Sequence, residues 1–151
     1  MPEVSPAPRA LARRALLDDA GERPEPAALA EAIERADARL RARLVDLVGL
    51  TGYTALVARA VRLARAENPA LDRVTVDTGA DAEGTLRGVR EAVEAARARG
   101  DPRAAEAGLI SILAHIIGLL ITFIGEDLAL RLVHEAWPEP APDHAAPERR
   151  A

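Results

Sequence analysis

The chain has 151 residues, a length that suits one domain with tails, and its formal net charge at pH 7 is −4. It is 49% hydrophobic but only 2% aromatic, so alanine (34 residues) and aliphatic side chains supply the apolar content. The absence of cysteine excludes a disulfide framework, a thiolate metal site and a cysteine nucleophile. All 20 basic residues are arginine, which we attribute to a GC-rich bacterial genome. Much Ala, Leu, Arg and Glu favours helices over sheets, and we predict an all-α bundle.

Proline marks the limits of the predicted domain. Five prolines fall within residues 1–26 and four within 138–151, whereas only Pro69 and Pro102 lie between them. A Pro-rich polar segment cannot bury enough apolar surface to offset the entropy lost on ordering. We therefore expect residues 1–26 to be a disordered or weakly helical tail and residues 138–151 to be a disordered tail. The remaining residues, 27–137, should form a bundle of about four helices.

The first two predicted helices cover residues 27–48 and 53–67. Apolar side chains recur in both at steps of three and four, which places them on one helical face. Gly49 and Gly52 separate the two helices, and Asn68-Pro69 ends the second because the residue before a proline disfavours helical backbone.

Residues 71–84 lack helical periodicity. Val74-Thr75-Val76 has strand propensity, but no second strand is predicted to pair with it, so we expect a loop. A third helix is predicted over residues 85–99, with Gly100 as its C-terminal glycine.

The fourth predicted helix extends from Asp101 to Trp137. A straight helix of this length would measure about 54 Å, well beyond the others, so it should bend or split. Gly125 is the predicted break, because Glu126 and Asp127 follow it and acidic residues favour the start of a new helix.

Residues 107–125 contain no formally charged side chain and are long enough to cross a membrane. One alternative is a central helix buried in a soluble bundle; the other is a membrane span in a small membrane-anchored protein. His115 within the segment and the lack of Trp or Tyr at its ends favour the soluble alternative. Three amphipathic helices that need an apolar partner also precede it, so we expect a cytoplasmic protein. The first 20 residues contain no apolar run typical of a signal peptide.

A stripe of small residues crosses the same segment at steps of three and four. Such a stripe forms a groove in which a second helix can approach closely. The helix could belong to this chain, to a second copy in a homodimer, or to a partner protein. The residues of this predicted interaction groove are Ala104, Ala107, Ser111, Ala114, Gly118, Thr122, Gly125 and Ala129.

Patterns typical of catalysis or cofactor binding are not found. His115, His134 and His144 have no metal-ligand spacing, so we expect no metal and no cofactor. Residues 79–88 contain several glycines but neither the lysine nor the spacing of a phosphate-binding loop.

One resemblance concerns His115. Ala114-His115, together with Gly118 and Gly125, is similar to the phosphoacceptor helix of histidine phosphotransfer domains. Ile116-Ile117-Gly118 stands where that family has its lysine and glycine, so we do not transfer the function.

Arginines align along both of the first two helices, but residues 27–106 contain 13 acidic residues and 13 arginines. The first stripe consists of Arg35, Arg39 and Arg43, and the second of Arg59, Arg62 and Arg65. We interpret them as solvated, salt-bridged faces. With few aromatic residues for stacking, the chain is not expected to bind nucleic acid.

These patterns together favour a non-enzymatic interaction or regulatory module that self-associates or binds a partner helix through residues 104–129. His115, Glu126, Asp127 and Arg131 are candidates for a switch or for polar contacts. A small membrane-anchored protein is the alternative, and a phosphotransfer protein or other enzyme using His115 is the third hypothesis.

Overall fold

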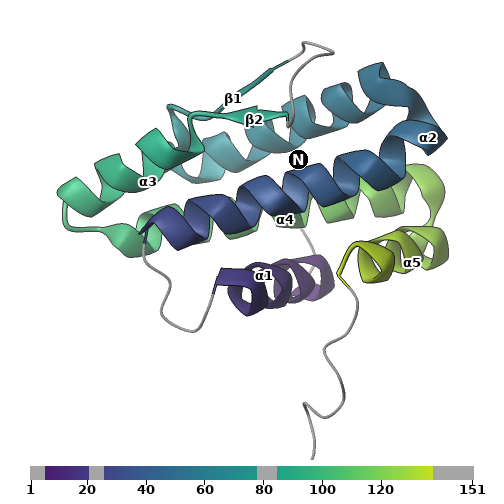
Figure 1. Ribbon diagram of the computed structural model, residues 1–151, viewed down its shortest axis with the longest axis horizontal. Helices are drawn as coiled ribbons and strands as arrows, with labels where there is room; N and C mark the ends of the chain where they lie inside the picture. Colours follow the sequence, from purple (N-terminus) through teal and green to yellow (C-terminus); the bar gives the residue numbers. More distant parts are fainter. Residues whose placement is uncertain (1–5, 21–25, 78–84, 138–151) are drawn as a thin grey trace, which may run out of the picture.

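The computed structural model describes residues 6–20, 26–77 and 85–137. Within these ranges the α-helices are α1 (Pro6–Ala20), α2 (Pro26–Glu67), α3 (Val89–Ala98), α4 (Pro102–Ile124) and α5 (Glu126–Ala136). They are joined by a short 3-10 helix, η1 (Pro69–Leu71), and by two strands, β1 (Thr75–Val76) and β2 (Leu86–Arg87). Figure 1 shows the helices packed side by side, with α1 and α5 along one edge. The predicted all-α bundle is confirmed, whereas the predicted tail at 138–151 lies outside the described residues.

Helix α2 contains a kink at Gly49, which has φ 81° and ψ 162°. Only glycine adopts this backbone conformation without strain, so the helix bends there and its second half returns along the bundle (Figure 1). The predicted boundary at Gly49 is confirmed. Gly52 is helical, so the second half begins earlier than the predicted residue 53.

Helix α4 is the centre of the core and packs against α1, α2, α3 and α5. Its side chains are almost continuously buried from Gly108 to Ile117, as expected for a helix surrounded on all sides. At Gly125 (φ 89°) the chain turns into α5, so the predicted split of the fourth helix is confirmed.

Two helical segments, Ala27–Glu67 and Pro102–Ile124, are long and apolar enough to cross a membrane. In the second, 61% of the apolar window is buried inside the fold, compared with 39% in the first. The bundle itself therefore provides apolar partners for most of α4.

Helix α1 belongs to the bundle and packs against α4 and α2. Its buried apolar residues are Ala12, Ala15 and Leu16. The prediction for residues 1–26 allowed a weakly helical segment, which α1 provides, but it did not include packing into the bundle. Pro6 and Pro8 suggested disorder, but they occupy the first turn of the helix, where a missing N–H costs nothing.

A short antiparallel ladder replaces part of the predicted loop. Thr75 pairs with Arg87 and Val76 with Leu86. The second strand was missed because residues 85–87 were assigned to the third helix, which instead begins at Val89.

Gly88 lies between the second strand and α3 with φ 82°. A Cβ atom at this position would lie 1.9 Å from the carbonyl oxygen of Arg73, so the backbone of the preceding loop occupies the space that any side chain would need. Gly100 has a similar φ of 80° but nothing within 4 Å of its would-be Cβ.

We expect Gly88→Ala to destabilise the fold more than Gly100→Ala does. Both variants incur the cost of a positive φ, about 1–2 kcal/mol, and Gly88→Ala adds a steric cost of about 1–3 kcal/mol. Urea unfolding of the two variants measures the difference. Equal losses in the free energy of unfolding would show that β2 does not need this close approach.

Candidate functional site

The predicted interaction groove is not one open surface. Its buried members are Ser111, Ala114 and Ala129, its half-buried members Ala104 and Gly118, and its exposed members Ala107, Thr122 and Gly125. The chain itself covers the middle of the stripe, and the turn at Gly125 moves Ala129 onto α5. The part that remains accessible is the C-terminal end of α4.

The buried part of the stripe adjoins a polar cluster centred on Glu67, the last residue of α2. The Ser111 hydroxyl donates to Glu67 Oε1 at 2.9 Å, and His115 Nε2 lies 3.5 Å from Glu67 Oε2. From α1, Arg9 Nη2 lies 3.7 Å from Glu67 Oε1. Glu67 therefore links three helices, although the sequence alone gave no signal for it.

The Glu67 cluster has the residue types of a catalytic triad but not the order. In a triad, histidine lies between the nucleophile and the carboxylate, whereas here the carboxylate of Glu67 accepts the Ser111 proton directly. His115 is 2% exposed and its Nε2 has no hydrogen-bond partner. A phosphoacceptor must be accessible, so this burial argues for a packing role.

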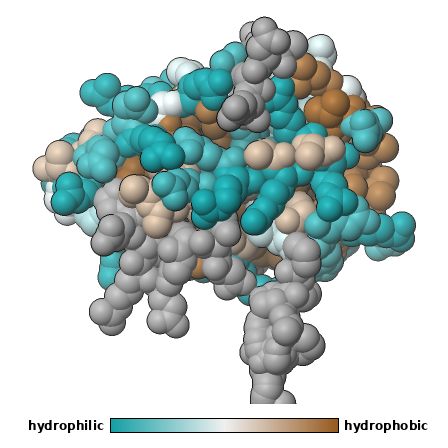
Figure 2. Space-filling view, viewed as in Figure 1, coloured by the Kyte–Doolittle hydropathy of each residue, from teal (hydrophilic) through white to brown (hydrophobic). Residues whose placement is uncertain are grey.

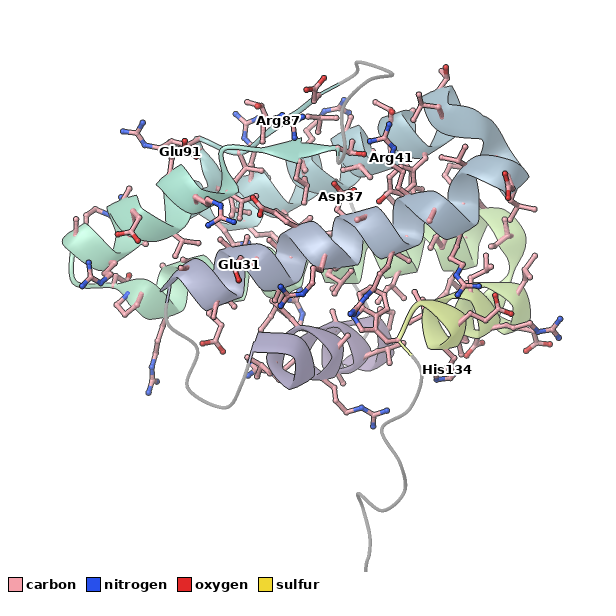
Figure 3. The ribbon with its side chains drawn as sticks, viewed as in Figure 1. Glu31, Asp37, Arg41, Arg87, Glu91 and His134 are labelled. Carbon is pink, nitrogen blue, oxygen red and sulfur yellow. The ribbon has the colours of Figure 1, made fainter. Side chains whose placement is uncertain are left out.

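Glu126, Asp127 and Arg131 are exposed on α5, away from the buried His115. Asp127 and Arg131 line a shallow depression with three neighbours on the same helix, Leu130, His134 and Glu135. His134 is labelled in Figure 3. Of the four predicted polar residues, the structure therefore brings Asp127 and Arg131 together. Because only one helix lines this depression, it would enclose little of a ligand.

A second polar cluster, which the sequence did not predict, surrounds Asp37 of α2. This carboxylate is 2% exposed. Its Oδ1 accepts the Tyr53 hydroxyl at 2.7 Å, and its Oδ2 accepts the backbone N–H groups of Thr85 and Leu86, the latter at 3.1 Å. Asp37 therefore ties both halves of α2 to the start of β2. A signal was present, since Asp37 lies between Ile33 and Leu40 on the apolar stripe.

A pocket of about 370 Å³ lies beside Asp37, between α2 and β2. The residues that line it are Glu31, Glu34, Arg35, Asp37, Ala38, Leu86 and Arg87, of which Figure 3 labels Glu31, Asp37 and Arg87. Its acids already have partners: Arg90 lies 3.1 Å from Glu34, and Arg35 lies 3.8 Å from Glu31. The charges of the pocket are thus largely compensated within the chain.

Exposed apolar side chains gather at one end of the bundle. Among the described residues the large exposed hydrophobics are Leu47 (49%), Val48 (40%) and Phe123 (67%). The first two precede the kink in α2 and the third precedes the α4–α5 turn, which lie at the same end of the molecule (Figure 1). Figure 2 shows hydrophobic surface gathered at that end. We call this surface, formed by residues 47–50 and 121–125, the apolar end.

The chain matches no protein-family profile, no curated protein and no solved structure. Within the described ranges no group of three or more His, Asp or Glu side chains could hold a metal ion. The geometry of the clusters and of the apolar end is therefore the basis for any functional proposal.

We expect Asp37→Ala to cost about 2–4 kcal/mol, because it leaves two buried N–H groups without their acceptor. It also removes the nearer acceptor of the Tyr53 hydroxyl, which then keeps only the Asp37 carbonyl oxygen at 3.1 Å. Tyr53→Phe removes the hydroxyl that contacts both the carboxylate and the backbone carbonyl of Asp37, and it should cost about 1–2 kcal/mol. Urea unfolding of both single variants and of the double variant forms a double-mutant cycle. Strictly additive losses would contradict direct coupling between the two side chains.

Burial raises the pKa of Tyr53 well above its ordinary value, and the adjacent Asp37 carboxylate raises it further. The stability gained by keeping this proton is fully present below about pH 10, the ordinary tyrosine pKa, and is lost as the pH rises toward the raised pKa. Over that interval the free energy of unfolding should fall by up to about 1.4 kcal/mol per pH unit.

The chain has no lysine and no other tyrosine, so Tyr53 dominates this alkaline range. Urea unfolding measured below and above about pH 10 should show that the free energy of unfolding falls with pH in the natural chain but not in Tyr53→Phe. An identical alkaline fall in both proteins would assign it to another group.

Proposed function

We propose that this chain is a non-enzymatic interaction module that binds a protein partner through the apolar end. The observation that carries the proposal is the shared location of Leu47, Val48 and Phe123, the large exposed hydrophobics of the described residues. Scattered single hydrophobics are normal on protein surfaces, but a contiguous apolar patch marks an interaction site. Full burial of one such side chain contributes about 1.5–3 kcal/mol, so a partner that covers all three gains substantial affinity.

This proposal keeps the predicted helix but moves the binding surface along it. The middle of the predicted groove is occupied by this chain, whereas Thr122 and Gly125 flank Phe123 and remain exposed. The Thr122 hydroxyl donates to the Gly118 carbonyl at 3.1 Å, so its proton does not need an acceptor from a partner. A partner therefore meets a surface that is chiefly apolar.

The two polar clusters support structural roles, which favours a binding module over an enzyme. Asp37 directs its carboxylate at buried donors of the same chain, and Glu67 accepts from buried Ser111. Asp37 is buried and has no access to an external substrate, whereas the Glu67 side chain is 38% exposed and its carboxylate contacts Ser111 and Arg9 of the same chain. The membrane-anchored alternative would require α4 to exchange its contacts with four helices for lipid, and the burial of Leu109, Leu113 and Ile117 supports the packed state.

Site-specific photocrosslinking in the source cells tests the proposal. A benzoyl-phenylalanine replaces Phe123 or Leu47 in turn, and the matched control replaces Ala98, which is exposed at the end of α3 at the opposite end of the bundle (Figure 1). We expect a discrete protein adduct from positions 123 and 47 and none from position 98. Equal labelling from all three positions, lipid adducts, or no adduct would contradict a protein-binding apolar end.

Phe123 should also matter little for folding. We expect Phe123→Ser to change the free energy of unfolding by less than about 0.5 kcal/mol, as for other surface substitutions. The control Leu113→Ala, in the buried centre of the same helix, should cost about 2–5 kcal/mol. Comparable losses in urea unfolding would mean that Phe123 serves the fold rather than a partner.

A further inference from the structure

We infer that the partner of the apolar end is a different protein whose apolar contact segment is flanked by basic residues. This inference rests on the proposed function and adds the chemical class of the partner. It excludes two other occupants of the same surface, namely a second copy of the chain and an anionic membrane.

Within the two chain segments that form the apolar end and its immediate flanks, the charged side chains are all acidic. Residues 44–51 and 119–128, which form this end and its immediate flanks, contain the exposed acids Asp46, Glu126 and Asp127 and no basic residue. The end therefore combines an apolar centre with an acidic rim.

The nearest arginines along the chain lie outside these two segments. Arg43 precedes the first segment, and its guanidinium lies 3.3 Å from Glu135 of α5. Arg131 lies one turn beyond Asp127, in the shallow depression on α5.

This charge distribution discriminates among the possible occupants. Two copies that met through their apolar ends would bring six acidic side chains to the edge of one interface, and like charges placed together oppose association. An anionic membrane attracts basic rather than acidic surfaces. A protein segment with Arg or Lys around its apolar side chains complements both the centre and the rim.

A charge-reversed copy of the chain provides a defined probe. The triple variant Asp46→Lys, Glu126→Lys, Asp127→Lys keeps the apolar end and gives it a basic rim. The isosteric variant Asp46→Asn, Glu126→Gln, Asp127→Asn is the uncharged control. All three positions are exposed, and circular dichroism with urea unfolding checks that each variant folds. If the triple reversal does not fold, Asp46→Lys with Glu126→Lys replaces it.

Sedimentation analysis of the proteins alone and in mixtures gives the readout. We expect the natural chain and the charge-reversed copy each to be monomeric and their equimolar mixture to form a one-to-one complex. This complex should be at least about ten-fold tighter than self-association of either protein, and it should weaken as salt is added. Phe123→Ser in the natural chain should abolish it, and the uncharged control should self-associate more than the natural chain does.

Several results would overturn the inference that the partner is a different, basic protein segment. Among them are self-association of the natural chain as tight as the mixed complex, no association in the mixture, and binding of the natural chain to vesicles of phosphatidylcholine and phosphatidylglycerol. A mixed complex that is insensitive to Phe123→Ser would instead contradict the proposed function. Association that depends on Phe123 but not on the rim charges would leave the proposed function standing and remove only the basic partner.

Discussion

The burial of α4 by its neighbours is the constraint on which the rest of this fold depends. The helix carries almost no charge and is too apolar to be exposed along one side, so α1, α2, α3 and α5 all pack against it. Burying aliphatic side chains is the main favourable term in folding, and a chain with so few aromatics must gather its aliphatics in one place. The other four helices are therefore positioned so that together they cover the apolar side chains of α4.

Enclosing α4 also creates the polar features of the molecule. Ser111 and His115 lie on a helix that becomes buried, and buried polar atoms need partners. Glu67 at the end of α2 accepts the Ser111 hydroxyl, whereas His115 Nε2 lies 3.5 Å from Glu67 Oε2 and has no hydrogen-bond partner. Asp37, on the other side of α2, is likewise a carboxylate that satisfies buried donors. It accepts the backbone N–H groups of Thr85 and Leu86 at the start of β2. Because α4 ends at the turn that faces the kink in α2, its last residues are left uncovered, and the apolar end is the result.

Much of the fold was predictable because local signals agreed with it. Three- and four-residue periodicity predicted the helices, and Gly49 and Gly125 marked the bends because glycine alone adopts their backbone without strain. The sequence allowed a weak helix where α1 lies, but its prolines gave no sign that this helix packs into the bundle. The strand β2 was missed because its residues resembled the start of a helix. In both places packing against distant residues outweighs local propensity.

The sequence by itself determined the helical class, the absence of thiol chemistry and the identity of the central helix, since these depend on composition and periodicity. The tertiary structure alone decided which face of that helix stays accessible. Periodicity does not distinguish a small-residue stripe filled by the same chain from one left open, and Phe123 follows the same apolar pattern as the buried Leu120. Exposure depends on where neighbouring helices end, which is set by contacts between residues far apart in the chain.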